Sequence, residues 1–184
     1  MTLARFTTRD LELMPIKEGW RYEIIDGELY VSTQPSWQHQ YVCGRINSVL
    51  DAWNVASGLG FVLPAPGVIF AEDDNVAPDV TWISRERLAA FAGAAGHIYG
   101  APELVVEVLS PGRANQMRDR EAKLDLYRRR EVSEYWLVDW EARTIEVYRG
   151  DGGELRRVAH LGPEGSLTSP LLPGFSCPIA SLFP

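Results

Sequence analysis

Two acidic residues lie beside runs that predict buried β-strands. Asp79 directly precedes the apolar run 80–83, and Glu107 lies in the middle of the run 104–109, which reads L-V-V-E-V-L. An ionised carboxylate that leaves water without a partner costs several kcal/mol. Glu107 must therefore be paired, protonated or bound to a cation. Asp79 has a second interpretation, because an aspartate after a proline is also a common turn residue at the start of a strand.

A lysine follows on the next predicted element. Residues 114–130 contain no proline or glycine and are rich in helix formers, and Met117, Leu124 and Tyr127 recur on one face. At about 100° per residue, Lys123 falls roughly 40° round the helix from Tyr127, at the edge of that face. Two carboxylates on adjacent strands can hold a hard cation such as Mg²⁺. A neighbouring ammonium can orient the attacking water and offset charge on a phosphate.

The same segment is locally basic. Residues 111–130 contain seven Lys or Arg against three acids, although the whole chain carries a net charge of −7. One interpretation is a solvated helix face with arginines at the helix C-terminus. The other is a contact with the phosphates of DNA, for which the candidates are Arg113, Arg118 and Arg120.

Two further polar residues lie on elements that precede Asp79. The run 20–32 predicts a hairpin around Asp26-Gly27, and Glu23 on its first strand is either a solvated outer residue or an inward acid. Its position alone favours solvent. His39 lies in the first turn of a helix predicted over 37–56, where a histidine is more often a surface or cap residue than a ligand. Residues 72–74 predict an exposed acidic loop.

Length and composition indicate one soluble domain over residues 1–184. The chain is 46% hydrophobic and 23% charged, as in ordinary globular proteins. No run approaches the roughly 18 apolar residues of a membrane span, and the N-terminus lacks a signal-peptide core, so we expect a cytoplasmic protein. Cys43 and Cys177 lack a metal-like spacing and predict buried thiols. The net charge argues against non-specific coating of nucleic acid.

Taken together, these motifs resemble the PD-(D/E)XK nuclease superfamily and, within it, the Uma two family of restriction-endonuclease-like proteins. The resemblance covers most of residues 20–150 and depends on five pieces in order: Y-E-I-I-D-G-E at 22–28, P-D-V at 78–80, P-E-L-V-V-E-V-L-S-P at 102–111, D-R-E-A-K-L-D-L-Y at 119–127 and E-Y-W-L-V-D at 134–139. It implies an α/β (α+β) fold in which helices flank a mixed β-sheet, with an N-terminal hairpin and a C-terminal antiparallel meander. It also implies Mg²⁺- or Mn²⁺-dependent hydrolysis of DNA phosphodiester bonds, and commonly a homodimer.

The resemblance assigns roles by position. Asp79 and Glu107 would be the metal carboxylates, the backbone carbonyl of Val108 a third ligand, and Glu23 an accessory acid. The superfamily pattern expects a lysine two residues after the second acid, but the chain has Leu109 there. In the Uma two pattern a lysine on the following helix takes its place, and Lys123 matches it.

Several alternatives remain at this level. Tyr127 would brace the site, contact substrate or pack in the core, and His39 is a possible accessory residue. The competing function is a catalytically silent nuclease fold that acts as a nucleic-acid-binding or protein-interaction module. A serine or cysteine hydrolase is disfavoured, because the chain has no G-x-S-x-G or phosphate-loop motif and no cysteine beside a suitable histidine. No organic cofactor and no membrane partner are expected.

Overall fold

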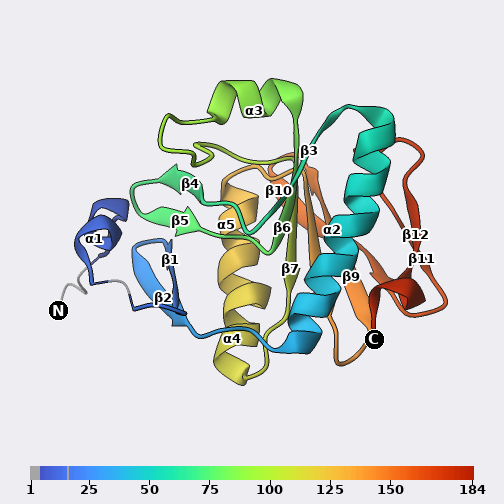
Figure 1. Cartoon of the computed structure of the whole chain (residues 1–184), viewed down its shortest axis with the longest axis horizontal. Helices are drawn as coiled ribbons and strands as arrows, with labels where there is room; N and C mark the ends of the chain where they lie inside the picture. Colours follow the sequence, from blue (N-terminus) through green and yellow to red (C-terminus); the bar gives the residue numbers. More distant parts are fainter. Residues whose placement is uncertain (1–4, 16) are drawn as a thin grey trace.

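A computed structural model describes residues 5–15 and 17–184, except for the side chains of residues 113 and 114. A six-stranded mixed sheet forms its centre (Figure 1). The strand order is β10 (Glu154–Leu161), β9 (Thr144–Asp151), β8 (Glu134–Asp139), β7 (Leu104–Val108), β6 (Val80–Ser84) and β3 (Gly60–Pro64). Among these six described strands, β7 and β8 are the pair that runs in parallel, and the crossover between them carries a helix, as is usual for parallel neighbours. The predicted mixed sheet and C-terminal meander of β8, β9 and β10 are confirmed.

A smaller antiparallel sheet lies beside the central one. Its strand order is β2 (Glu28–Ser32), β1 (Arg21–Ile25), β5 (Asp74–Val76) and β4 (Val68–Ala71). β1 and β2 form the predicted hairpin, with Asp26 at φ 49° and Gly27 at φ 72° in its turn. Two successive positive φ angles are those of the type I′ turn, whose twist matches that of paired strands.

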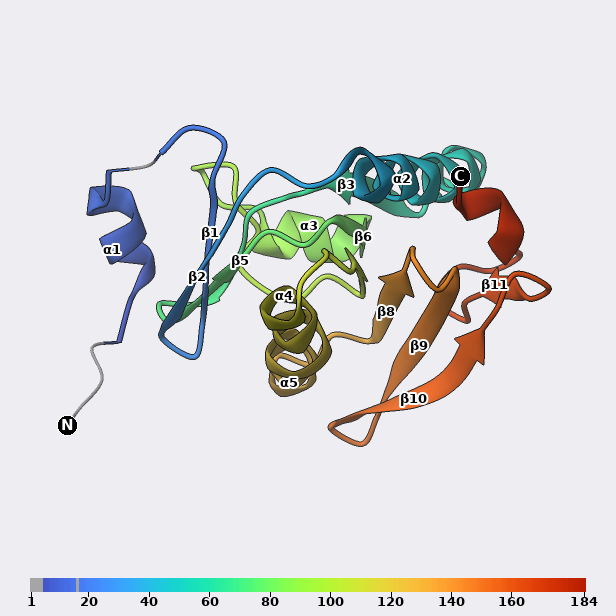
Figure 2. The same cartoon turned by 90° about the horizontal axis from the view of Figure 1, so that it is seen from below.

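Helices cover both faces of the central sheet (Figures 1 and 2). On one face lies α2 (Trp37–Ser57), and on the other lie α4 (Arg113–Met117), the π-helical segment η1 (Arg118–Ala122) and α5 (Lys123–Arg129). The structure also has α3 (Arg85–Phe91), the 3₁₀ helix η2 (Ile179–Leu182) and α1 (Thr8–Leu13), which lies beyond the hairpin of β1 and β2, away from the central sheet (Figures 1 and 2). Thr7, Ser36 and Ser84 cap α1, α2 and α3 through their hydroxyls. Among the residues that the structure describes, none of the helices combines the length and the hydropathy of a membrane span.

The side chains of β7 alternate between two cores. Val106 and Val108 pack with α2, whereas Val105 and Leu109 pack in the cluster that includes α5. By the same alternation, Glu107 faces α5. Residues 166–183 complete the α2 side with a short pair of strands, β11 (Ser166–Thr168) and β12 (Ser176–Pro178).

Three local predictions need correction. The helix after β7 is not uniformly α-helical, because η1 interrupts it. Met117 is 46% exposed, whereas the predicted Leu124 and Tyr127 pack in the α5-side core together with Leu126. Asp74 is 1% exposed rather than part of an exposed loop, because its carboxylate accepts hydrogen bonds from the Asp26 backbone and from Arg130.

Candidate active site

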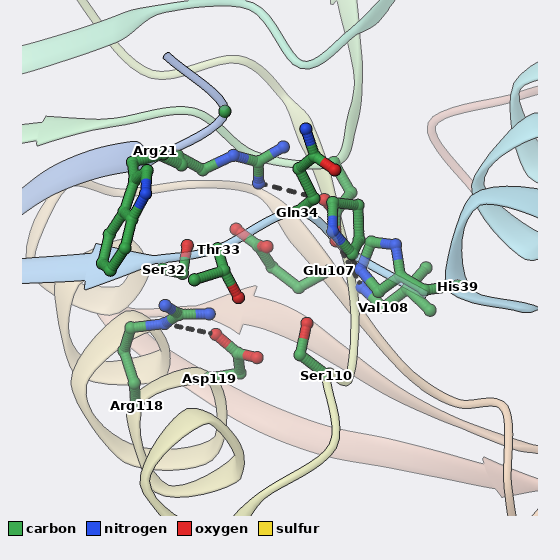
Figure 3. Close-up of a pocket in the computed structure, with 14 residues that line it drawn as sticks. Arg21, Ser32, Thr33, Gln34, His39, Glu107, Val108, Ser110, Arg118 and Asp119 are labelled. Carbon is green, nitrogen blue, oxygen red and sulfur yellow. Dashed lines mark hydrogen bonds and ion pairs between the residues drawn. The ribbon is translucent and has the colours of Figure 1, made fainter. Parts of the chain in front are cut away.

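A cavity of about 200 Å³ opens where the hairpin, the start of α2, the end of β7 and η1 meet. Polar side chains dominate its wall (Figure 3). The polar and charged residues in that wall are Arg21, Ser32, Thr33, Gln34, His39, Asp79, Glu107, Ser110, Arg118 and Asp119. Asp79 and Glu107, the two acids that the sequence singles out, therefore share one cavity.

Asp79 is held from three sides. Its Oδ2 accepts the backbone N–H of Val108 at 2.9 Å, which fixes the carboxylate against the neighbouring strand β7. The same Oδ2 lies 3.2 Å from Nε2 of His39, and Oδ1 lies 3.2 Å from Arg21. Burial opposes ionisation, but the hydrogen bond and charge of His39, followed by the charge of Arg21, lower the pKa of Asp79. This carboxylate is ionised at neutral pH.

Glu107 is a buried acid with two donors on one oxygen. Its Oε1 accepts from Lys123 Nζ at 2.8 Å and from the Tyr127 hydroxyl at 2.5 Å. Burial, with the charges of nearby acids such as Asp79 and Asp119, raises the pKa of Glu107 to about 7 against the opposing pull of Lys123. Glu107 is therefore poised between its protonated and ionised forms near neutrality.

Lys123 connects two acids inside the protein. It is 0% exposed, and its Nζ lies 3.0 Å from Glu23 as well as 2.8 Å from Glu107. Helical geometry predicts the edge of the apolar face, but the structure buries this residue completely. Burial lowers the pKa of the ammonium, and the surrounding carboxylates of Glu107 and Glu23 outweigh that effect and raise it. Lys123 stays charged at neutral pH.

Glu23 faces inward, so its predicted solvent exposure is wrong. β1 is covered on both faces, and Glu23 is 1% exposed. Its Oε1 accepts the backbone N–H of Ala77 at 3.0 Å, while Oε2 has no hydrogen-bond partner among the described residues. Arg118 lies 3.8 Å from Oε2. Burial raises the pKa of Glu23, but Lys123 and then Arg118 outweigh it and lower the pKa below its usual value.

His39 and Tyr127 are both buried. His39 is 3% exposed and bonds to Asp79, so its expected surface position is wrong. The first turn of α2 points at the sheet here, which the helix pattern alone does not reveal. Tyr127 is 0% exposed, with its ring 5.1 Å from that of Tyr135, so it both packs in the core and braces Glu107. A contact with substrate is incompatible with that burial.

The three candidate arginines differ in their surroundings. Arg118 lines the cavity, and its Nε lies 2.9 Å from Asp119 Oδ1. Arg120 turns away from the cavity and pairs with Glu146 at 2.6 Å and Asp139 at 3.3 Å. The side chain of Arg113 lies outside the described residues. Leu109 is 2% exposed in the α5-side core, so Lys123 reaches Glu107 from the helix instead.

Two charged residues that line the cavity are absent from the sequence-based set. Arg21 lies two residues before Glu23 on β1, a spacing that puts both on one face of the strand. Asp119 lies four residues before Lys123 in sequence, and its Oδ1 is 4.0 Å from the lysine Nζ. Both spacings were available as signals. The sequence does not show which face of the hairpin or of η1 points into the protein. The two spacings alone therefore do not distinguish inward-facing from outward-facing residues. Val108 is present through its N–H, and the proposed role of its carbonyl stays a prediction.

Comparison with known proteins assigns the chain to a family. A family model described as "Putative restriction endonuclease", Uma2, matches residues 8–180. The chain belongs to the Uma2 family. The sequence resemblance to that family is thereby confirmed. A search among curated proteins found no match.

A solved structure supports the fold of this Uma2 chain. It is described as the "Crystal structure of a putative nuclease belonging to DUF820 from Anabaena variabilis". The two chains superpose with a TM-score of 0.78 over 97% of each, at 20% sequence identity. At that identity the likeness concerns the fold, and the predicted fold class is confirmed.

Proposed function

We propose that this protein is a metal-dependent nuclease that hydrolyses DNA phosphodiester bonds. The observation that carries the proposal is that Asp79 and Glu107 line one polar cavity, with the buried Lys123 bonded to Glu107. Membership in a restriction-endonuclease-like family supports the same reaction class. Lys123 is a buried ammonium beside Glu107, a carboxylate with a raised pKa. Such an arrangement is typical of a functional site, and a role in binding a cation and a phosphate would explain it.

The donor set fits a hard divalent cation. Asp79 and Glu107 offer carboxylate oxygens to the cavity, and Val108 offers a carbonyl, which are the ligand types that Mg²⁺ and Mn²⁺ prefer. Oε2 of Glu107 makes no hydrogen bond to any described residue, so it is available without breaking a contact. When bound, the cation would polarise the phosphate and supply a nucleophilic water.

Three basic side chains have separate roles in the proposed reaction. Lys123, held by Glu23, keeps a positive charge beside Glu107, where it can orient water and offset charge on the phosphate. Arg21 and Arg118 enter the cavity from β1 and η1, with Glu107 drawn between them (Figure 3). Arg21 is paired with Asp79. Release of Asp79 to a cation would free that guanidinium for a substrate phosphate.

Cleavage of supercoiled plasmid DNA with Mg²⁺ or Mn²⁺ tests the proposal. We expect nicking by the parent protein and a loss of at least about 100-fold in Glu107→Gln and in Lys123→Met, since each removes one charge from the site. Glu103→Gln is the matched control, because Glu103 lies at the other end of β7 and bonds to Ser84 and Arg87. Equal nicking by all four proteins, or by none, would favour the catalytically silent alternative.

The proposal also includes a homodimer and a cytoplasmic location, which follow from the resemblance and the composition. Sedimentation velocity over a range of concentrations tests the first, and a single species at the monomer mass throughout would remove it. Fractionation of the source cells tests the second.

A further inference from the structure

A second cavity adjoins the first, and α2 forms one side of it. Its volume is about 210 Å³, and its polar lining consists of Arg21, Gln40, Cys43, Asn47 and Asp79. Arg21 and Asp79 also line the first cavity. Asp79 therefore stands between two cavities, and one of them has a thiol in its wall.

The polar residues of α2 that approach Asp79 recur every fourth position. His39, Cys43 and Asn47 follow one another at this spacing, which places them on one face of the helix. Cys43 Sγ lies 3.4 Å from His39 Nδ1, and His39 Nε2 lies 3.2 Å from Asp79 Oδ2. One ligand atom from each of these three residues lies within 4.8 Å of the other two.

The two contacts use different nitrogens of the His39 ring, Nδ1 towards Cys43 and Nε2 towards Asp79, so a single ion can bind only one of them. In a tetrahedral Zn²⁺ site, bonds of about 2.0–2.3 Å separate neighbouring ligand atoms by roughly 3.3–3.6 Å. The three ligand atoms, which lie within 4.8 Å of one another, would therefore draw closer together round an ion. A sulfur, an imidazole nitrogen and a carboxylate oxygen are all ligands that Zn²⁺ accepts, whereas Mg²⁺ excludes the sulfur. The donor set thus selects a different cation from the all-oxygen set of Asp79, Glu107 and Val108.

We propose that His39, Cys43 and Asp79 form a binding site for Zn²⁺. The adjoining cavity leaves room for a fourth ligand, and Asn47 Oδ1 in its wall is a buried acceptor without a partner among the described residues. Burial, followed by the charge of Asp79, raises the pKa of the Cys43 thiol, so the side chain carries its proton at neutral pH. That thiol gives up its proton to the solvent when Zn²⁺ binds.

One consequence concerns the proposed nuclease and depends on it. Asp79 belongs to both ligand sets, so Zn²⁺ bound on the α2 side withdraws a carboxylate from the hard-cation site and adds a like charge next to it. Zn²⁺ is therefore an antagonist of Mg²⁺ in this protein. The zinc site itself does not require nuclease activity.

Titration of the metal-free protein with Co²⁺ tests the site directly. Cobalt is a spectroscopic substitute for zinc, and a thiolate ligand gives it a strong near-ultraviolet charge-transfer band. We expect that band in the parent protein and its loss in Cys43→Ala, together with a fall in calorimetric Zn²⁺ affinity on the order of 100-fold. Cys177→Ala is the matched control, since Cys177 is the other buried free cysteine and packs in the core that includes β12.

The outcomes separate the two proposals. No band in the parent protein, a band retained in Cys43→Ala, or a band lost in Cys177→Ala would each overturn the zinc site. Circular dichroism checks that each variant is folded, and Cys43→Ser, which is close to the native side chain in size, replaces Cys43→Ala if the alanine variant unfolds. A parent protein that binds Zn²⁺ through Cys43 but never nicks DNA would end the nuclease proposal and leave this one standing.

Discussion

Lys123 is the cation that balances the buried acids of the site. The chain has two lysines, and Lys123 is fully buried, a rare environment for this side chain. It lies between Glu23 and Glu107, neither of which can reach water freely. The single ammonium therefore offsets the negative charge of these two acids and reduces their repulsion inside a medium of low dielectric constant.

Replacement of this lysine by methionine should destabilise the metal-free protein by about 3–5 kcal/mol, because the change leaves buried carboxylates without their cation. Chemical denaturation measures the effect. Lys17→Met is the control, since Lys17 is exposed and its loss should change the free energy of unfolding by less than about 0.5 kcal/mol. Addition of Glu23→Gln to Lys123→Met should restore part of the loss. A double variant no more stable than Lys123→Met would contradict this account of the cluster.

The raised pKa of Glu107 predicts the pH dependence of stability. The folded protein holds a proton on this group up to about pH 7, where the unfolded chain has already released it above its ordinary value of 4.5. This contribution is therefore complete below pH 4.5 and is lost as the pH rises through 7, by on the order of 3 kcal/mol. Denaturation in EDTA between pH 5 and 8 should show the decline in the parent protein.

The Glu107→Gln variant supplies the control for that experiment, since it cannot lose the proton and should lack this component of the slope. Mg²⁺ added at pH 8 should raise the stability of the parent protein more than that of the variant, because a cation favours the ionised carboxylate. Identical pH profiles for the two proteins would rule out Glu107 as the titrating group.

At the scale of the element, η1 is the irregular feature that shapes the cavity. The backbone N–H of Lys123 bonds to the carbonyl of Arg118, five residues back, so the helix widens by one residue there. Arg118 and Asp119, the first residues of this turn, both line the cavity. The buried hydroxyl of Tyr135 on β8 donates to the Asp119 backbone carbonyl at 2.9 Å. The central sheet thus stabilises the π-helical turn through this hydrogen bond from β8.

Loss of that support should be measurable in Tyr135→Phe. The change leaves the buried carbonyl of Asp119 without this donor and should cost about 1–3 kcal/mol. Tyr148→Phe is the matched control, because the Tyr148 hydroxyl bonds to the partly exposed side-chain network of Glu146 and should cost less. Thermal unfolding of both variants gives the comparison. Equal losses would indicate that η1 does not depend on Tyr135.

At the scale of the whole molecule, the basic segment carries less free charge than its sequence suggests. Arg128 and Arg129 pair with Asp125, Arg130 with Asp74, and Arg120 with two acids of the meander. The net charge of the chain is −7. Among the described residues, Arg21 and Arg118 are the arginines that line the cavity, so contact with DNA should be local rather than spread over a basic face.

The salt dependence of DNA binding should therefore be shallow. Two phosphate contacts predict a slope of roughly −2 for the logarithm of the binding constant against the logarithm of salt concentration. Fluorescence anisotropy of a labelled duplex with the Glu107→Gln variant measures it without cleavage. Arg118→Gln should reduce the slope by about 1, whereas Arg120→Gln should leave it unchanged. A parent slope of −6 or steeper would indicate a larger basic surface elsewhere.

Most of the framework was determined locally in the sequence. The hairpin follows from Asp26-Gly27 and the buried strand β7 from its β-branched run, and the helix predicted over 37–56 is α2. Each of these depends on short-range sterics and periodicity, which the printed residues reveal. Glu107 was conspicuous for the same reason, because an acid in such a run needs a partner.

Which side chains contact one another, in contrast, was decided only by the tertiary structure. The sequence left Glu23 open to solvent, His39 at the surface and Lys123 at an edge, and the structure buries all three. Whether a side chain of a strand or helix faces inward depends on what packs against it from distant parts of the chain, and no local pattern contains that information. The sequence by itself determined which residues could do chemistry, and the packing of β1, α2 and α5 around the sheet decided which of them meet.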